Sequence, residues 1–269
     1  MEQLIKAAVL GLIQGLTEFL PVSSSGHLVI FSELLNFQQK GIAFDVFVHF
    51  GTLLSILVFF RKDLAAMFAA PVQVWLQKKD DPQMRHYLNW DLYIIVATIP
   101  AVIVGLFFKD AIENLFTSTL FVFFMLLITG SLMFFAQNLK FRNTNFNYGN
   151  SFLIGIAQAV AIIPGISRSG STIFTGMALG IERESVARFS FLMSVPAILG
   201  AVVLEMKDLL QAPPTSAEML DLIVGALVAF VSGYVAILWL LDMVKKGKLR
   251  WFGYYCFALA FAGLIWYWV

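Results

Sequence analysis

The chain has 269 residues, of which 59% are hydrophobic and only 13% are charged, whereas soluble domains carry about 25% charged residues. This composition excludes an ordinary soluble domain and predicts an integral membrane protein. The net charge of +1 gives no electrostatic reason to expect a nucleic-acid partner. The single cysteine, Cys256, excludes an internal disulfide and a cysteine metal cluster, and we expect it to be a small apolar residue in a late helix.

The N-terminal part of the chain consists of two apolar runs separated by a proline. A run at residues 4–20 has no basic segment before it, so no cleaved signal peptide is expected, and it stops at Pro21. Proline lacks a backbone N–H and clashes with the preceding turn, so one continuous helix cannot pass through this position. A second run at residues 28–35 is also shorter than the roughly 20 residues that a spanning helix needs. We therefore predict a re-entrant hairpin over residues 4–36.

The remaining chain alternates apolar stretches with polar connections. A second hairpin is expected at residues 151–180, where Pro164-Gly165 repeats the opening break. Residues 61–89, 109–116 and 137–150 are expected to be connections without spans. The six expected spans are 42–60, 90–108, 120–136, 186–204, 219–241 and 251–269.

An internal repeat supports this organisation. At an offset of about 144, each half matches the other in its glycines, glutamine and serines. The matching pairs are Gly11 and Gly155, Gln14 and Gln158, Ser23 and Ser167, Ser25 and Ser169, and Gly26 and Gly170. Each half is thus one hairpin plus three spans, and because three is odd the second half enters from the opposite face. We predict an all-α, single membrane domain over residues 1–269, with inverted repeats at 1–138 and 151–269 whose breaks meet near the midplane.

The basic residues of the connections predict an orientation. Eleven Lys and Arg residues fall in segments 61–89, 137–150 and 244–250, against two in segments 109–117 and 207–218. The positive-inside rule places the first group in the cytoplasm. Both termini and the opening hairpin are then expected to face outward.

Charged and polar residues gather at the two breaks. Gln14 and Glu18 are four residues apart and share one helix face. Arg168 is the charged residue of the second break, and an ionisable residue inside a membrane is a functional hypothesis by default. Its planar fork of donors suits phosphate, and the helix starting at each break would present free N–H groups to an anion. The accompanying hydroxyls and glycines are Ser23, Ser24, Ser25, Gly26, Ser167, Ser169, Gly170 and Thr172.

This combination predicts a phosphate or diphosphate site, and Glu18 and His27 add acid/base groups beside a hydroxyl. Structural alternatives stay open. Glu18 could only neutralise Arg168, His27 could cap the break, and the serines could satisfy backbone groups there. His49 lies four residues after Asp45, and this pair is expected to stabilise the end of a helix at the membrane interface. A solvated helix start or the surface is expected for Glu182, Arg183, Glu184, Arg188 and His86.

The segments Glu18-Phe-Leu-Pro-Val-Ser-Ser-Ser-Gly-His27 and Pro164-Gly-Ile-Ser-Arg-Ser-Gly-Ser-Thr172 closely resemble the two signature motifs of the bacterial undecaprenyl-diphosphate phosphatase family, the bacitracin-resistance type. The resemblance extends over the whole chain. It implies a phosphoric anhydride hydrolase of the bacterial cytoplasmic (inner) membrane that removes the terminal phosphate from a C55 polyprenyl diphosphate. This reaction recycles the lipid carrier of cell-wall polymer synthesis, with roles in peptidoglycan synthesis, cell shape and bacitracin resistance. A homodimer is also envisaged.

The resemblance implies roles for individual residues. It places Glu18, Ser24, His27 and Arg168 on catalytic positions. It implies a divalent cation, Mg²⁺ or Ca²⁺, and the candidate ligands here are Gln14 and Glu18. The family's first motif position takes Glu or Gln, so this chain offers one carboxylate where others offer two. Its phosphate-contacting positions correspond to Ser23, Ser25, Ser167, Ser169 and Thr172, beside Gly26 and Gly170.

Two reactions and one rival function remain open. Ser24 could attack the terminal phosphorus while His27 or Glu18 accepts its proton and Arg168 stabilises the phosphoryl oxygens; alternatively, water attacks directly. A transporter or flippase for a phosphate-bearing lipid would need the same arginine and amides but no nucleophile.

Overall fold

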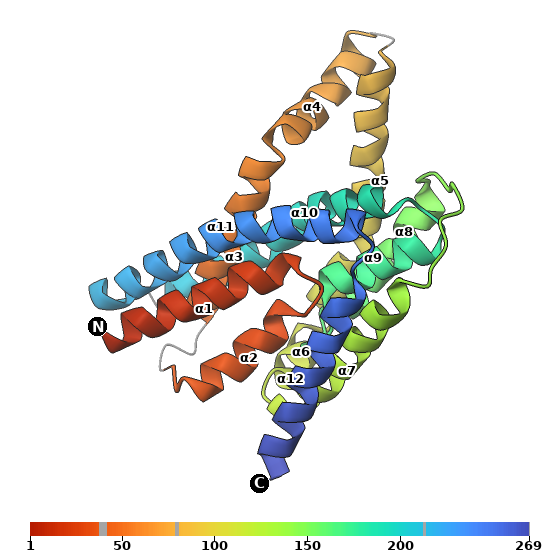
Figure 1. The fold of residues 1–269 in the computed structure, drawn as a ribbon. Coiled ribbons are helices and arrows are strands. Elements are labelled where there is room, and N and C mark those ends of the chain that lie inside the picture. The colour runs from red at the N-terminus through yellow and green to blue at the C-terminus, as the bar shows by residue number, and fades with distance from the viewer. Residues whose placement is uncertain (38–41, 79–80, 212–213, 269) are drawn as a thin grey trace.

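The computed structural model describes residues 1–37, 42–78, 81–211 and 214–268. These residues form helices and connecting loops, with no strand among them (Figure 1). The all-α membrane fold expected from the sequence is confirmed. The helices are α1 (Glu2–Phe19), α2 (Ser24–Leu34), α3 (Ile42–Phe59), α4 (Arg61–Pro71), the π-helix η1 (Val72–Leu76), α5 (Pro82–Phe107), α6 (Lys109–Leu115), α7 (Thr119–Ala136), α8 (Tyr148–Val160), α9 (Arg168–Ala178), α10 (Arg183–Gln211), α11 (Ser216–Lys245) and α12 (Arg250–Trp268).

Within the described residues, four helices are long and apolar enough to cross a membrane. They are Pro82–Phe107, Thr119–Ala136, Arg183–Leu204 and Glu218–Lys245. A fifth span arises if Ala43–Phe59 and Arg61–Leu76 are counted together, although the chain bends by 77° between them. The sixth expected span corresponds to α12, which is helical but rich in Trp and Tyr and is not among the apolar spans.

The expectation that residues 61–89 form a connection is wrong. The chain bends at Phe60 and continues as α4 and η1, and α5 begins at Pro82. The charges that suggested a loop serve helix ends instead: Asp63 lies in the first turn of α4, where the helix dipole favours an anion. The Asp81 carboxylate accepts a hydrogen bond from the Gln83 N–H at 2.9 Å and caps α5. Segment 109–116 is likewise not a plain loop, since it contains the short helix α6.

Each of the two breaks ends one helix and starts another with a serine cap. Helix α1 ends at Phe19, two residues before Pro21, and α2 begins after Ser23, whose Oγ accepts from the Gly26 N–H at 3.3 Å. Helix α9 begins after Ser167, whose Oγ accepts from the Gly170 N–H at 3.1 Å. The serine and glycine positions that repeat in the sequence therefore make the same capping contact twice.

Helices of the two halves pack against one another in matching pairs. Helix α1 packs along α11, and α8 packs along α5; α3 packs on α10, and α7 on α12. Small residues permit the close approach, because a Cβ added at Gly11 would lie 2.3 Å from the Gly225 carbonyl oxygen, and one at Gly155 would lie 2.3 Å from that of Ala97. These pairings are the ones that a two-fold relation between the halves would produce. The division into repeats at 1–138 and 151–269 stays a prediction.

Candidate functional site

The site lies where the two breaks meet. A Cβ atom at Gly26 would lie 3.1 Å from the Gly165 Cα, and one at Gly170 would lie 3.4 Å from the Pro21 Cβ. The Ser169 hydroxyl donates to the Leu20 carbonyl oxygen at 3.1 Å. The N-termini of α2 and α9 are thus brought together, although 144 residues separate their first residues in the chain. The first N–H groups of a helix have no partner within the helix and its dipole is positive there, so two such ends favour an anion between them.

Glu18 is the centre of this site. Its side chain is only 7% exposed, and its Oε1 pairs with the Arg168 Nη2 at 2.6 Å. Its Oε2 accepts from the Ser24 hydroxyl at 2.6 Å and from the Gln14 side-chain amide at 2.9 Å. The His49 Nε2 lies 3.8 Å from the same oxygen. The cost of burying this carboxylate is therefore offset by a cation and two hydrogen-bond donors.

Arg168 retains a donor for a ligand. Its Nη2 is used by Glu18, while its Nη1 is buried and has no hydrogen-bond partner among the described residues. A buried guanidinium nitrogen without a partner costs free energy that an anionic oxygen would recover. The predicted juxtaposition of Glu18 and Arg168 is therefore present, with part of the arginine fork still available.

The serines form two mirrored pairs. Ser23 Oγ lies 3.3 Å from Ser25 Oγ, and Ser167 Oγ lies 3.2 Å from Ser169 Oγ. Ser23 differs from its counterpart in its backbone: its φ is +70°, in the left-handed region, whereas Ser167 has φ −74°. A non-glycine residue there stores backbone strain, which is commonly found at functional sites.

The Thr172 hydroxyl is engaged by the backbone of α9, including the Ser169 carbonyl oxygen at 3.2 Å, and by α10. It contacts the Arg168 carbonyl oxygen at 2.9 Å and the Ser190 hydroxyl of α10 at 2.7 Å, and the side chain is fully buried. In this arrangement Thr172 supports the first turn of α9 beneath Arg168.

His27 is held by two contacts, and neither is to Ser24. Its Nδ1–H donates to the Ser23 carbonyl oxygen at 2.7 Å, so the neutral ring accepts at Nε2 from the Tyr255 hydroxyl, also at 2.7 Å. The ring also stacks on Tyr255 and on Phe31. The hydroxyl of Ser24 is paired with Glu18 instead, which makes Glu18 the better-placed proton acceptor.

Sequence reasoning missed three residues that support the site. Tyr255 of α12 holds His27, and Thr129 of α7 holds the second break by donating to the Gly165 carbonyl oxygen at 2.8 Å and accepting from the Ser167 N–H at 3.0 Å. His49 lies within α3 with its ring near Glu18, so placing it at a helix end away from the chemistry was wrong. Thr129 and Tyr255 have no local signal in the sequence, whereas His49 is an ionisable residue inside an expected span, which is a signal for a functional role.

The position of Arg188 also differs from the one expected from the sequence. It does not lie at a solvated helix start, because its Nη2 pairs with the Asp63 Oδ1 at 2.9 Å and its guanidinium lies over the Phe60 ring at 5.5 Å. Tyr87 donates to the same carboxylate oxygen at 3.3 Å. This cluster ties α10 to the bend between α3 and α4 and to α5. The surface position of His86 and the buried position of Cys256 are as expected.

The residues suited to a metal are few. Over the part of the chain that the structure describes, no three His, Cys, Asp or Glu side chains are arranged to hold an ion. Gln14 Oε1 is a buried oxygen without a hydrogen-bond partner, next to the Glu18 carboxylate to which the same amide donates. The Gln14 NH₂ group, and not its oxygen, faces Glu18, so a cation that uses both residues requires the amide to turn over and takes its other ligands from water and a bound phosphate.

Comparison with known proteins agrees with this geometry. The family model described as "Bacitracin resistance protein BacA" matches residues 7–262. A relative from Halothermothrix orenii, named undecaprenyl-diphosphatase, is 43% identical over 258 residues, covering 94% of both chains. Relatives with the same name from Christiangramia forsetii and Bacteroides thetaiotaomicron are 44% and 43% identical, and they cover 96% and 97% of this chain and 96% of their own. This chain belongs to the bacitracin resistance protein BacA family.

Proposed function

We propose that this chain is an undecaprenyl-diphosphatase that hydrolyses the terminal phosphate of a membrane-bound polyprenyl diphosphate. The observation that carries this function is the hydrogen bond of 2.6 Å from the Ser24 hydroxyl to Glu18, next to Arg168 and two helix N-termini. A hydroxyl paired with a carboxylate beside an anion site is what phosphoryl transfer to the protein requires. The product, the lipid monophosphate, re-enters cell-wall polymer synthesis, and its regeneration confers resistance to bacitracin.

The reaction follows from these contacts. The Ser24 oxygen attacks the terminal phosphorus as its proton passes to Glu18, and the bond from that phosphorus to the bridging oxygen breaks. The lipid monophosphate leaves and a phosphoserine remains. Arg168 and the N–H groups at the starts of α2 and α9 stabilise charge on the phosphoryl oxygens. Water then attacks the phosphoserine, which releases orthophosphate and restores the Ser24 hydroxyl.

Replacing Ser24 separates this mechanism from direct attack by water. For Ser24→Ala we expect orthophosphate release from polyprenyl diphosphate to fall on the order of 10³-fold or more, because the nucleophile is lost. Ser131→Ala is the matched control, since its hydroxyl bonds only to the Leu127 carbonyl of its own helix. Substantial residual turnover by Ser24→Ala would reject the nucleophile and leave water as the attacking group.

The transporter alternative is less well supported. A carrier needs Arg168 and the helix N-termini, but it has no use for a hydroxyl hydrogen-bonded to a buried carboxylate. Orthophosphate release by the purified protein in detergent, where no transport across a bilayer occurs, distinguishes the two functions. Binding of the lipid diphosphate without release would favour the carrier.

We also propose that Mg²⁺ or Ca²⁺ binds together with the diphosphate, held on the protein side by Glu18 and the Gln14 Oε1. When bound, the ion would neutralise phosphate charge. For Gln14→Glu, we expect the cation concentration for half-maximal activity to fall several-fold, because a second carboxylate is added. Gln137→Glu at the exposed end of α7 is the control. An unchanged cation requirement in Gln14→Glu would place the ion elsewhere.

The membrane location, the orientation and the oligomeric state of the protein are also proposed. We propose that the protein lies in the bacterial inner membrane with both termini and the site facing outward, as the basic connections favour. A homodimer is also proposed. Mass determination of the purified protein in detergent tests the dimer.

A further inference from the structure

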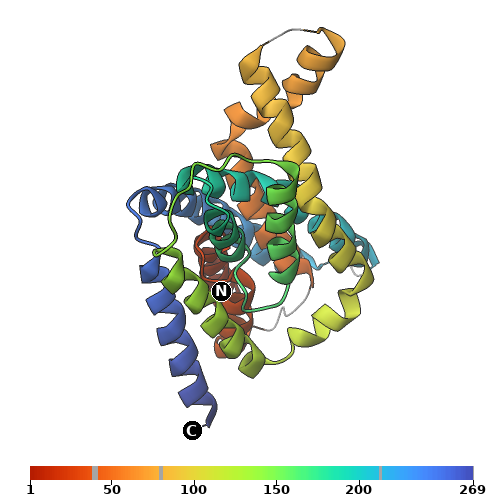
Figure 2. The same cartoon turned by 90° about the vertical axis from the view of Figure 1, so that its right-hand side faces the viewer.

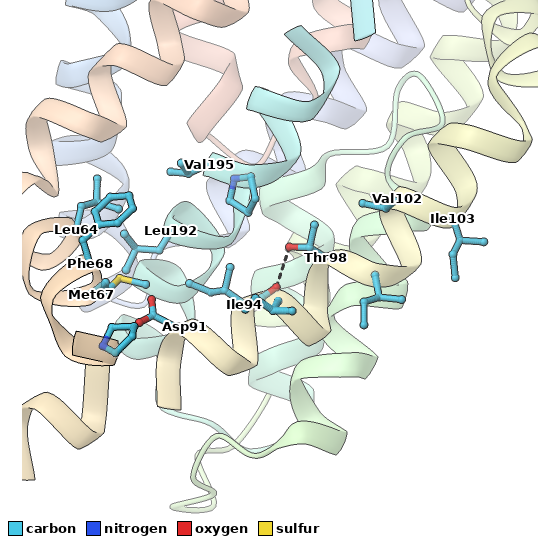
Figure 3. Close-up of a pocket in the computed structure, with 14 residues that line it drawn as sticks. Leu64, Met67, Phe68, Asp91, Ile94, Thr98, Val102, Ile103, Leu192 and Val195 are labelled. Atoms are coloured by element: carbon cyan, nitrogen blue, oxygen red, sulfur yellow. Dashed lines mark hydrogen bonds between the residues drawn. The ribbon is translucent and has the colours of Figure 1, made fainter. Parts of the chain in front are cut away.

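A long apolar groove lies apart from the serine and arginine cluster, between α4, α5 and α10 (Figure 3). We call it the α4–α5 groove; along α5 it runs from Asp91 to Ile103, with Met67 and Phe68 of α4 and Leu192 of α10 on its other sides. Its volume is about 640 Å³, within the range of sites that bind small organic molecules. Figures 1 and 2 show α4 and α5 projecting together from the rest of the molecule and diverging from each other toward α10.

The groove is polar at one end only. Asp91 lies at the end near Met67 and Phe68, while Val102 and Ile103 lie at the other end (Figure 3). The hydroxyl of Thr98, between them, is satisfied by the Ile94 carbonyl oxygen at 2.7 Å. At a rise of 1.5 Å per residue, the apolar wall extends about 18 Å from Asp91. This shape fits a molecule with one polar head and one hydrocarbon chain.

One oxygen of the Asp91 carboxylate has no hydrogen-bond partner among the described residues. This oxygen, Oδ2, is buried, and none of the side chains placed by the structure forms an ion pair with it. A buried carboxylate oxygen in apolar surroundings is costly unless a donor reaches it. Among the described residues, no Lys, Arg or His lines the groove, so a molecule bound there is the source of a donor that the structure points to.

The groove opens to the lipid. Helices α5 and α10 are among those long and apolar enough to cross a membrane, and Ile95 and Ile99 of α5 are 60% and 45% exposed. Asp91 lies where the apolar stretch of α5 begins, one turn or more after the polar residues Gln83, Arg85 and His86 of its first turns, which a polar head-group region would solvate. The acidic end of the groove is therefore placed near lipid head groups and the apolar end among acyl chains.

We propose that the α4–α5 groove binds a phospholipid whose head group carries a primary ammonium, with the ammonium at Asp91 and one acyl chain along α5. The ammonium supplies the N–H donors and the positive charge that Asp91 lacks. The enzyme's own substrate is a poor occupant, because its diphosphate would meet an unpaired carboxylate rather than a cation. The groove is thus a lipid site distinct from the hydrolytic centre and independent of the proposed reaction.

The test is native mass spectrometry of the full-length protein in detergent, titrated with phosphatidylethanolamine or with phosphatidylcholine of the same acyl chains. Phosphatidylcholine is the matched probe, since its quaternary ammonium has no N–H to donate. We expect the wild type to bind phosphatidylethanolamine about tenfold more tightly, and Asp91→Asn to lose most of this preference. Ile99→Trp should fill the groove and weaken binding of phosphatidylethanolamine several-fold. Leu227→Trp, at a 58% exposed position of α11, should leave it unchanged.

Equal binding of the two lipids by the wild type would overturn the proposal. Binding of phosphatidylethanolamine by Ile99→Trp as tight as by the wild type would also overturn it. Displacement of phosphatidylethanolamine by added polyprenyl diphosphate would assign the groove to the substrate tail instead. Thermal melting of each variant shows that it is folded.

Discussion

At the scale of single residues, the chemistry depends on how one buried carboxylate shares its contacts. Glu18 holds Arg168 with one oxygen and Ser24 and Gln14 with the other. Glu18 thus fixes both the direction of the Ser24 hydroxyl, the proposed nucleophile, and the position of the Arg168 guanidinium. The two residues of opposite charge come from different breaks, so neither hairpin contains a complete site.

The role of His27 at this scale can be tested through Tyr255. Tyr255→Phe keeps the ring that stacks on His27 but removes the hydroxyl that donates to its Nε2. We expect kcat to fall about tenfold or less with little change in KM, because one neutral hydrogen bond is worth about 1 kcal/mol. His27→Ala should be much more damaging, since it also frees the Ser23 carbonyl at a strained position.

Steady-state kinetics on both variants, with their pH profiles, measures the difference. If His27 accepts the Ser24 proton, Tyr255→Phe should shift the pH dependence of kcat, because the hydroxyl acts on the proton-accepting nitrogen. An unchanged profile together with a small loss of kcat supports Glu18 as the acceptor.

The functional residues at the breaks could be predicted from the sequence, whereas the residues of other helices that hold them in place could not. Glu18 and Arg168 are rare charges in apolar surroundings next to a proline, and the internal repeat relates their segments. Thr129 and Tyr255 are unremarkable members of the apolar helices α7 and α12. Their importance comes from packing against segments 36 and 228 residues away, which leaves no trace in local composition.

At the scale of elements, proline and serine at the breaks predicted the helix ends, because these residue types act through backbone geometry and capping. The same reasoning failed for α4, where Arg61, Lys62 and Asp63 looked like the end of a span. Charged residues also serve first turns of helices and ion pairs, as Asp63 does with Arg188 of α10. A bend of 77° allowed the chain to remain helical beyond the charges.

The second break is held by a side chain of another helix, and this contact gives a prediction for Thr129. Thr129→Val keeps the shape but leaves the Ser167 N–H and the Gly165 carbonyl without their partner. We expect a loss of stability on the order of 2–3 kcal/mol and reduced turnover, because Arg168 directly follows Ser167. Thr129→Ser retains the hydroxyl and should recover most of both.

Thermal unfolding in detergent and orthophosphate release measure these effects. Thr98→Val is the matched control, because the Thr98 hydroxyl bonds only within its own helix. A Thr129→Val protein as stable and active as Thr98→Val would show that the break holds its shape without this contact.

At the scale of the whole molecule, two of the three basic segments lie side by side. Arg250 donates to the Asn138 side chain at 3.3 Å, and Lys245 pairs with Glu184 at 3.1 Å. Arg183 reaches the Leu139 carbonyl oxygen at 3.4 Å. Segments 137–150 and 244–250, which the sequence placed on one side, are therefore neighbours in space, together with the start of α10. By the positive-inside rule, we expect this basic end to face the cytoplasm.

This rule predicts the orientation of the chain in the membrane. In a Cys256→Ser background, Glu2→Cys should react with a membrane-impermeant maleimide in intact cells, because the N-terminus then faces outward. Lys140→Cys should react only after the membrane is permeabilised. Glu2 and Lys140 are both exposed, so a difference in labelling reports the side of the membrane and not burial. The reverse pattern would place the basic end outside and turn the opening hairpin, with Ser24 and Glu18, toward the cytoplasm.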